Sequence, residues 1–292
     1  MAASIYLAGG ILSLFYRFEG YGLGVSRSDE YNGLAAVVAA TRETAGDHFG
    51  RAMVGWLRGH VGFDHCVAFG YRGASRPPLL FETFSPAESH VFVALYQEGP
   101  YLLDPFHHAA VERKEGFWRM RELAPDRFYA SEYYRSYYSQ TRLAEEVGFF
   151  VPLPGKDALV LSLMRLRASG PFGTADARLL RDMAPAVISL ARLRWPGLPA
   201  DEAAVTPRDE YAAVASDFDR AHIWKSLSLT SREKQVVDLV LQGHSTESIA
   251  RALRIVPGTV KVHRRNIYRK LKIKSQAGLF ARFVEIIDAQ IG

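Results

Sequence analysis

The stretch TVKVHRRNIYRKL, residues 259–271, carries six Lys, Arg and His side chains among its thirteen residues. At 100° per residue, Val260, Ile267 and Leu271 lie within about 40° of one line along a helix. The opposite side presents one apolar and three basic side chains: Val262, Arg265, Arg269 and, flanking them, Lys261. The stretch therefore predicts a helix that packs on one side and presents a basic face on the other. Taken alone, a solvated surface helix has the same pattern.

Capping signals place further short helices around this stretch. Thr230 and Glu233 stand in the S/T-x-x-E relation of a capping box, and Gly243 suits the left-handed residue that ends a helix. Ser245 and Ser275 can cap two more helices. The second and third of these four helices, joined by RIVPG, predict a helix-turn-helix whose third helix enters a major groove of DNA.

The charge distribution supports a separate phosphate-binding module at the end of the chain. Residues 226–292 carry 12 Lys and Arg against 5 Asp and Glu, a net charge of +7. The whole chain has a net charge of +5, which leaves −2 on residues 1–225. Basic side chains that neutralise the phosphate backbone supply most of the non-specific affinity for DNA. Double-stranded DNA is therefore the expected partner of residues 226–292.

Residues 229–280 resemble the DNA-binding domain of the LuxR family of bacterial transcription regulators. The matching positions are Leu229, Thr230, Arg232, Glu233, Gly243, Ile249, Ala250, Leu253, Thr259, Val260, Lys261, His263, Asn266, Ile267, Tyr268, Lys270, Leu271 and Phe280. The resemblance implies that the third helix reads the major groove and that the fourth contributes to dimer contact.

The resemblance also implies a role for each residue of the third helix. Base readers are expected at Lys261, Val262 and Arg265, and contacts nearer the phosphates at Thr259, Asn266, Arg269 and Lys270. The family usually has Ser or another capping residue before the proline, where this sequence has Val256, which cannot accept the free amides of the helix. The last region of a bacterial sigma factor is the rival interpretation. A sigma factor needs an aromatic, basic region upstream, and residues 1–225 are slightly acidic.

Residues 29–194 predict an α+β fold, an α/β/α sandwich with an antiparallel sheet, ahead of the all-α helix-turn-helix domain. Strands are expected where apolar and β-branched or aromatic residues alternate between turn signals, and helices where the spacing is helical. The expected strands are 64–72, 79–84, 147–153 and 158–166, and the expected helices are 29–58 with a break near Gly46, 87–98, 126–140 and 174–194.

Four segments follow from these elements: an N-terminal extension (1–28), a sensing domain (29–194), a linker (195–225) and the DNA-binding domain (226–292). The apolar run from Ile5 to Tyr16 is too short to span a bilayer, and no basic segment of a secretory signal precedes it. It is either an additional packed segment or the product of an upstream start codon. The single cysteine, Cys66, fits a buried position in a reducing cytoplasm, and no membrane partner is expected.

Residues 35–192 resemble the autoinducer-binding domain of the same family. The stretch LYQEGPYLLDPFHHAAVERKEGFWRM (95–120) contains its Tyr-x-x-Asp-Pro segment ahead of an aromatic stretch that ends in Trp, and LAEEVGFFVPL (143–153) its later Gly-and-Pro strand. The resemblance implies that Asp104 accepts a hydrogen bond from a ligand amide, with walls from Tyr101, Phe106, Phe117 and Trp118. The family's acyl-lactone binders carry a Trp where this sequence has Val91. We therefore expect ligands that bear an amide N–H or an amine rather than an acyl lactone.

Other interpretations of these residues stay open. Asp104 before Pro105 is equally typical of a turn or a helix cap. Trp118 and the run SEYYRSYY (131–138) are either core residues or a cage for an amine or quaternary ammonium ligand. A catalytic first domain and a ligand-independent regulator are the alternatives to a ligand-responsive homodimer that works with RNA polymerase. No catalytic residue, cofactor or metal site is predicted, and neither a receiver's acidic pair nor a nucleotide-binding loop is found.

Overall fold

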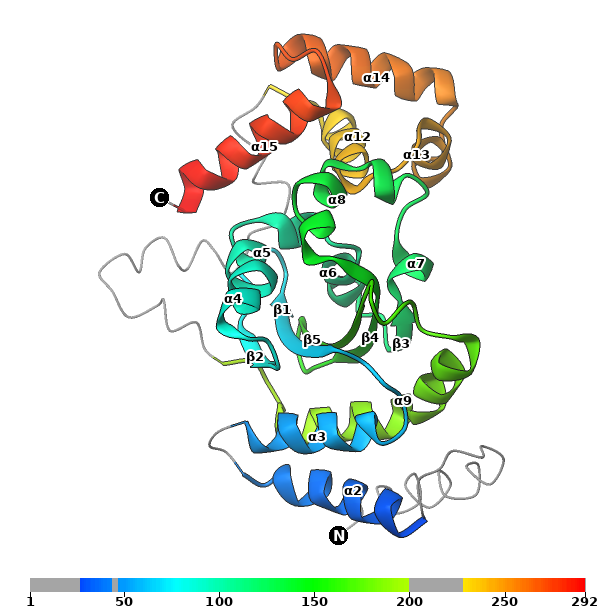
Figure 1. Ribbon diagram of the computed structural model, residues 1–292. Helices are drawn as coiled ribbons and strands as arrows, with labels where there is room; N and C mark the ends of the chain where they lie inside the picture. Colours follow the sequence, from blue (N-terminus) through cyan, green and yellow to red (C-terminus); the bar gives the residue numbers. More distant parts are fainter. Residues whose placement is uncertain (1–26, 44–46, 200–227, 292) are drawn as a thin grey trace, which may run out of the picture.

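The computed structural model describes residues 27–43, 47–199 and 228–291. An N-terminal domain with a five-stranded sheet precedes a C-terminal domain of four helices (Figure 1). This is the predicted combination of an α+β domain and an all-α helix-turn-helix domain. The predicted N-terminal extension and linker lie mostly outside the described residues.

The sheet is antiparallel throughout and has the order β2-β1-β5-β4-β3. Its strands are β1 (His65–Arg72), β2 (Leu79–Glu82), β3 (Gly116–Arg119), β4 (Leu143–Pro152) and β5 (Asp157–Leu166). The central strands β1, β5 and β4 are buried on both faces, because helices cover the sheet from both sides. Four of the five strands were predicted from the sequence. Strand β3 was not.

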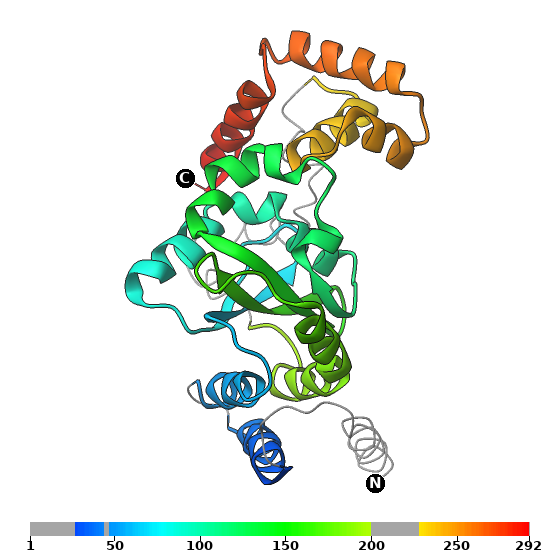
Figure 2. The ribbon, with the colours of Figure 1, turned by 45° about the vertical axis from the view of Figure 1, so that its right-hand side comes forward.

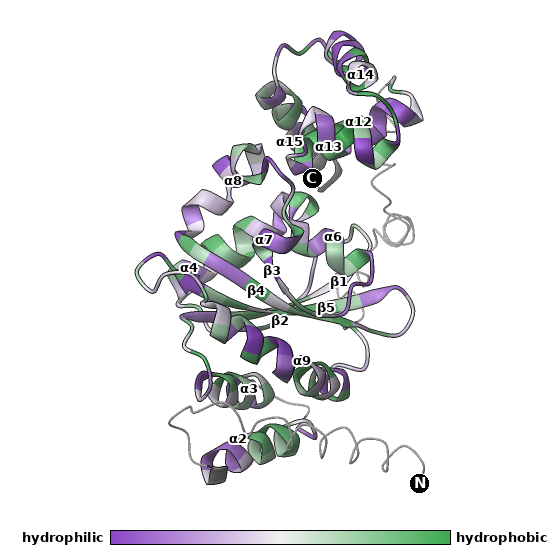
Figure 3. Ribbon diagram, turned by 90° about the vertical axis from the view of Figure 1, so that its right-hand side faces the viewer, coloured by the Kyte–Doolittle hydropathy of each residue, from purple (hydrophilic) through white to green (hydrophobic). Residues whose placement is uncertain are grey.

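One face of the sheet packs on helices α3 (His48–Arg58) and α9 (Thr174–Arg194), with α2 (Arg27–Ala40) packed against α3. Figure 3 shows this layer on one side of the sheet and the short helices on the other. Cys66 is fully buried in this core, as the sequence predicted. Within the described residues, no helix is long and apolar enough to cross a membrane.

Short helices cover the opposite face of the sheet. They are α4 (Pro86–Ser89), η2 (His90–Ala94), α5 (Leu95–Gln97), η3 (Pro100–Leu103), α6 (Pro105–Val111), α7 (Met120–Leu123), η4 (Phe128–Ala130), α8 (Glu132–Ser136) and η5 (Tyr138–Thr141). The helix predicted over 126–140 is thus divided into three. Ser131, with extended backbone, caps a new helix, and Tyr137 leaves the helical region with φ −122° and ψ −66°.

Helix α6 packs closely on strand β4 at a glycine. A Cβ atom at Gly148 would lie 2.9 Å from the Phe106 ring and 2.9 Å from the Val160 side chain. Only glycine leaves room for the Phe106 ring to lie on the sheet at this point. The Phe106 ring also meets Phe150 edge-on, with centroids 5.0 Å apart. This contact fixes α6, and with it the residue before α6, over the middle of the sheet.

The C-terminal domain consists of α12 (Ser231–Gln242), α13 (Thr246–Leu253), α14 (Pro257–Lys270) and α15 (Gln276–Ile291). Its helix ends follow the predicted caps. Thr230 and Glu233 form the capping box, Gly243 has φ 97°, and the Ser245 and Ser275 hydroxyls accept amide hydrogens. The Val256 side chain makes no capping hydrogen bond.

The two domains touch through α8, which contacts α12 and α15, and through the segment that leads into α8. The Arg127 amide donates to the Gly243 carbonyl over 3.0 Å, and the Ser245 amide donates to the Asp126 carboxylate over 3.0 Å. A Cβ atom at Gly243 would lie 2.9 Å from the Ser131 side chain. Figure 2 shows α14 on the far side of the C-terminal domain from this contact. The contact therefore leaves the exposed face of α14 open.

Val256→Ser should raise the free energy of unfolding of the C-terminal domain by about 0.5–2 kcal/mol, because a serine hydroxyl can accept an amide hydrogen of α14. Val256 is 65% exposed, so little packing is lost by the change. Urea unfolding followed on the C-terminal transition measures the gain. Val262→Ser, an exposed valine in the interior of the same helix, is the control. If the urea midpoint of Val256→Ser is equal to or lower than that of the wild type, the prediction of a missing cap is wrong.

Candidate functional site

Helix α14 presents the basic face that the sequence predicted. Val260 and Ile267 are buried and hold the helix against α12 and α13. Four side chains are exposed on the side that points away from this core: Lys261, Val262, Arg265 and Arg269. A basic helix held from behind by an apolar core is the arrangement with which a helix-turn-helix enters the major groove.

An exposed valine lies in the middle of this basic face. Val262 is 44% exposed, although each neighbour on that face is charged. In the major groove, an apolar side chain contacts the methyl group of thymine, and a guanidinium such as that of Arg265 pairs with guanine. The three predicted base readers, Lys261, Val262 and Arg265, therefore lie together on one surface.

The residues predicted to contact phosphates differ in their exposure and in their hydrogen-bond partners. Arg269 is exposed and donates to the Asn266 side chain over 3.2 Å, and Thr259 is half-buried. The Lys270 ammonium instead donates to Glu233 over 2.7 Å. Glu233 is buried and also accepts from the Thr230 amide, so Lys270 balances the charge of the capping box. A phosphate contact by Lys270 stays a prediction, and this lysine also has a structural role.

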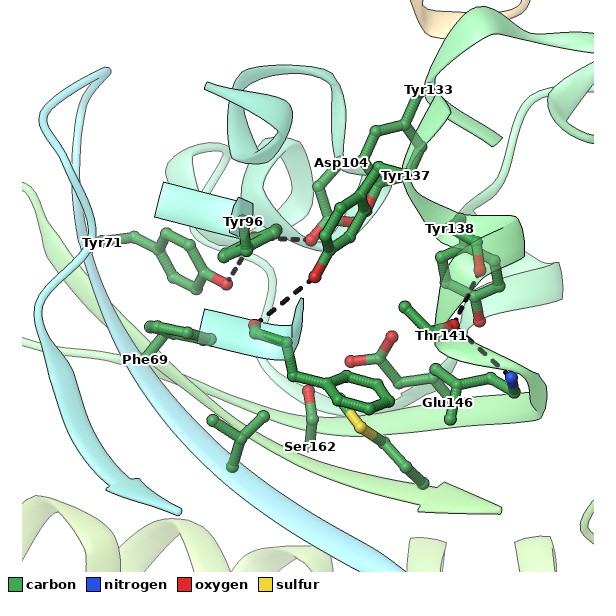
Figure 4. Close-up of a pocket in the computed structure, with 14 residues that line it drawn as sticks. Phe69, Tyr71, Tyr96, Asp104, Tyr133, Tyr137, Tyr138, Thr141, Glu146 and Ser162 are labelled. Carbon is green, nitrogen blue, oxygen red and sulfur yellow. Dashed lines mark hydrogen bonds between the residues drawn. The ribbon is translucent and has the colours of Figure 1, made fainter. Parts of the chain in front are cut away.

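A second candidate site lies in the N-terminal domain, between the sheet and the short helices (Figure 4). The space left free at its centre is about 20 Å³, about enough for one water molecule. Tyrosines, two carboxylates and two hydroxyl side chains surround it. The lining residues are Val67, Phe69, Tyr71, Phe92, Tyr96, Asp104, Tyr133, Tyr137, Tyr138, Thr141, Leu143, Glu146, Ser162 and Met164.

Asp104 is both a helix cap and a pocket residue. One carboxylate oxygen accepts the Phe106 amide hydrogen over 2.9 Å and so caps α6. The other accepts the Tyr96 hydroxyl over 2.6 Å, and Tyr96 in turn lies 3.0 Å from the Tyr71 hydroxyl. Asp104 is only 5% exposed. Burial raises the pKa of its carboxyl group to about 6, against the opposing effect of the two hydrogen bonds.

Glu146, on β4, brings a second carboxyl group into the same pocket. It is 8% exposed, and the Ser162 hydroxyl is a hydrogen-bond partner. Burial and, as a smaller effect, the nearby charge of Asp104 together raise the pKa of Glu146 to about 8, against the opposing effect of the hydrogen bond with Ser162. At neutral pH Glu146 is therefore mainly protonated.

The surrounding phenols respond to the same environment. Burial, followed by the charges of Asp104 and Glu146, raises the pKa of the pocket tyrosines well above the ordinary value. These tyrosines are Tyr71, Tyr96, Tyr133, Tyr137 and Tyr138. They therefore remain neutral and act only as hydrogen-bonding groups and aromatic walls.

Of the five ligand-binding residues predicted from the sequence, only Asp104 lines this pocket. Tyr101 is buried beside it and donates its hydroxyl to the Ala74 carbonyl over 2.8 Å. Phe106 lies on Gly148 between α6 and the sheet. These two rings support the pocket from outside.

Phe117 and Trp118 are consecutive residues of β3, at the edge of the sheet, and point to opposite faces because side chains alternate along a strand. Phe117 belongs to the core on the α9 side, next to Phe149. Trp118 donates to the Glu115 carbonyl over 3.1 Å, and the Lys114 ammonium lies over its ring. Neither lines the pocket.

The walls of the pocket come instead from other residues. Tyr133, Tyr137 and Tyr138 belong to the run SEYYRSYY, for which the sequence allows either core residues or an amine cage. Their burial is compatible with both readings. Glu146 was missed. Two consecutive glutamates inside the apolar stretch LAEEVGFFVPL indicate a buried carboxyl group but do not show which of the two faces the pocket.

Comparisons with known proteins identify a family, a relative and similar solved structures. A family model described as bacterial regulatory proteins, luxR family, matches residues 227–282. An HTH-type transcriptional regulator in the exeN 3′ region of Aeromonas salmonicida is 34% identical over 192 residues, which cover 65% of this chain and 97% of that protein. The LBD domain of VqsR from Pseudomonas aeruginosa is 26% identical with a TM-score of 0.48, covering 56% of this chain and 94% of that one. Escherichia coli SdiA is 16% identical with a TM-score of 0.38, and the match covers 88% of this chain and 98% of the SdiA chain.

Replacing Arg265 by Ala should cost about 1–3 kcal/mol on the preferred DNA site and relax the choice of one base pair. Arg269→Ala should weaken binding to all sequences and reduce the salt dependence by about one phosphate contact. Fluorescence anisotropy on a duplex selected from random sequence, and on an unrelated duplex, measures both effects. If both variants lose affinity equally on the two duplexes, the assignment of Arg265 as a base reader is wrong.

Glu146→Gln should remove part of the pH dependence of stability. A carboxyl group whose pKa is raised in the folded state stabilises the fold below its unfolded pKa, and that stability is lost as the pH rises through the folded pKa. For Glu146 the loss extends from about pH 4.5 to about pH 8, and for Asp104 from about pH 4 to about pH 6. The variant should therefore melt higher than the wild type at pH 8.5, by roughly 2–4 °C for each kcal/mol, with a smaller difference at pH 5.

Glu145→Gln provides the matched control for this measurement. Glu145 accepts two hydrogen bonds from Arg119, so its removal leaves a buried guanidinium without its counter-charge. This variant should lose stability at both pH values. A parallel pH profile for Glu146→Gln and the wild type would mean that Glu146 is not protonated in the folded protein.

Proposed function

Because this chain belongs to the luxR family of bacterial regulatory proteins, we propose that its N-terminal pocket binds a small organic effector that controls the DNA-binding domain. The resemblance predicted from residues 229–280 is confirmed, and the chain is a DNA-binding transcription regulator. In this proposal, binding of the effector changes DNA binding through the contacts between the two domains of the protein.

Asp104 is the acceptor for an N–H group of the effector. Its two oxygens offer about four lone pairs, and the bonds from Phe106 and Tyr96 occupy two of them. A further donor completes the hydrogen bonding of a carboxylate that is otherwise costly to bury. The aromatic walls supply apolar contact, as is usual for small-molecule pockets. The position at which the family's acyl-lactone binders carry a Trp is Val91 in this chain, and Val91 does not line the pocket.

The position of α8 between the pocket and the C-terminal domain supports the proposed control of DNA binding. Helix α8 and the residues around it line the pocket with Tyr133, Tyr137 and Tyr138, and Ser131, at the start of α8, lies against Gly243 at the end of α12. The free space holds about one water molecule, so an organic effector has to displace these tyrosines. A displacement of α8 changes the contact with the turn between α12 and α13.

Further partners follow from the same function. We propose that the regulator acts in the cytoplasm as a homodimer, because two copies of a helix-turn-helix read two half-sites of a symmetric operator. RNA polymerase is the partner through which a bound regulator changes transcription. A catalytic N-terminal domain is the competing hypothesis, and it predicts that the effector is chemically altered after incubation with the protein.

The effector should be recovered from the purified full-length protein by denaturation and mass spectrometry. Asp104→Asn keeps the shape of the side chain but replaces one acceptor by a donor, so the N–H-bearing compound should be lost from this variant. Tyr101→Phe removes a hydroxyl outside the pocket and should retain it. Recovery of the same compounds from the wild type and from Asp104→Asn would contradict the role of Asp104. An unfolded Asp104→Asn variant would instead identify this residue as a purely structural cap.

The same preparation tests the coupling between the domains. Cys66 is buried, so dyes can be attached to cysteines introduced at the exposed positions Arg178 and Ala281. Adding back the recovered compound should change energy transfer between the dyes and the affinity for DNA, and the compound should remain chemically unchanged. Asp126→Ala, which removes the acceptor of the Ser245 amide, should shift energy transfer without the compound. Effector binding with no change in either signal would contradict the coupling.

A further inference from the structure

The pocket holds two buried carboxyl groups without a basic side chain beside them. Among the residues that the structure describes, no Lys, Arg or His lines the pocket, whereas Asp104 and Glu146 both do. The preceding residue, Glu145, is equally buried but receives two hydrogen bonds from Arg119 and lies 3.3 Å from Arg121. The fold thus neutralises one of two consecutive glutamates and leaves the other facing the pocket.

We propose that this pocket is selective for an organic cation, an alkyl- or arylalkylammonium whose charged nitrogen lies between Asp104 and Glu146. The inference rests on the proposed function and names the chemical class of the effector. Figure 4 shows the two carboxyl groups directed into one space, with tyrosines arranged around them. Glu146 is therefore a binding residue in addition to Asp104.

Two carboxyl groups favour a cation over a neutral ligand. A neutral amide offers an N–H to Asp104 but leaves Glu146 to be either protonated or buried with its charge. An ammonium group offers two or three donors and a positive charge, so it satisfies both groups at once. Nothing in the pocket provides a positive charge for a carboxylate or phosphate ligand. Anionic ligands are disfavoured for the same reason.

The tyrosines add a second attraction for a cation. Aromatic rings within about 6 Å attract an ammonium group, and the attraction is larger where water is excluded. Three of the phenol groups are already engaged: Tyr96 donates to Asp104, the Tyr71 hydroxyl lies 3.0 Å from that of Tyr96, and the Tyr137 hydroxyl is directed to the Phe92 carbonyl at 3.4 Å. These phenols therefore contribute mainly aromatic surface.

The protonation of Glu146 makes this selectivity dependent on pH. A bound cation favours the ionised carboxylate, so binding near neutral pH should release a proton from Glu146, whose pKa is about 8. The titratable groups that face Glu146 come from the sheet and from the helices above it. They are Asp104, Tyr71, Tyr96, Tyr133, Tyr137 and Tyr138. The tyrosines stay neutral, and Asp104 is already mostly ionised above its pKa of about 6.

Calorimetric titration of the full-length protein can test the class of ligand with defined probes. The probes are n-butylammonium and 2-phenylethylammonium, each compared with the alcohol of the same carbon skeleton, and butanamide as a neutral N–H donor. We expect both ammonium ions to bind at least about tenfold more tightly than their alcohols, because a tenfold ratio corresponds to only about 1.4 kcal/mol. Tetramethylammonium, whose charge is fixed, should bind more tightly at pH 8.5 than at pH 6.5.

Glu146→Gln is the decisive variant, and melting curves establish that it is folded. It should weaken binding of both ammonium ions at least about tenfold, leave butanamide unchanged and abolish the pH dependence for tetramethylammonium. Asp104→Asn should weaken ammonium ions and butanamide together. If butanamide binds as tightly as the ammonium ions, or if Glu146→Gln binds them normally, the cation proposal fails while an N–H ligand at Asp104 stands. Failure of both ammonium ions to bind at 10 mM also overturns it, whereas the effector recovered from the protein tests the proposed function independently.

Discussion

The hydrogen bond between Asp104 and the first turn of α6 holds the Asp104 side chain in the core of the N-terminal domain. One oxygen holds the Phe106 amide, and the Phe106 ring occupies the space that Gly148 leaves above the sheet. The amide and the ring of Phe106 thereby fix the start of α6 in two ways, through the cap and through the sheet. The second oxygen is then held beside Tyr96 in the pocket. A structural cap thus places a carboxylate in an aromatic core, and the chemistry of the pocket depends on that placement.

The C-terminal domain was predictable almost completely because its helix ends are determined locally. Thr230, Glu233, Gly243 and Ser245 each act within a few residues of their own position, so their roles can be read without knowing the fold. Strand β3 was missed because it has only four residues, too few for an alternating pattern to stand out. The helix predicted over 126–140 is divided for a related reason. The cap at Ser131 and the non-helical backbone of Tyr137 divide it into pieces of three to five residues, too short for a helical spacing to be recognised.

The pocket was predictable only where a motif identified a residue. Asp104 was found through the segment around Pro105, but the walls come from β1, α5, α8, η5, β4 and β5, which the fold alone brings together. Glu145 and Glu146 show the limit most clearly, since the same residue type occurs twice in succession. Strand alternation turns one toward Arg119 and the other toward Asp104. No property of the sequence alone distinguishes the paired glutamate from the unpaired one.

The contact between the domains sets the scale on which an effector can act. Two hydrogen bonds, the packing of Gly243 on Ser131 and the packing of α8 against α12 and α15 connect the two domains. A hydrogen bond contributes about 0.5–1.5 kcal/mol net, so the two hydrogen bonds alone stabilise one domain arrangement by about 1–3 kcal/mol. Such a difference matches the coupling free energies of about 1–3 kcal/mol that are typical of allosteric proteins. Helix α8 has only five residues and depends on its tyrosine contacts for stability, so the rings that an effector displaces are also those that hold the domain contact in place.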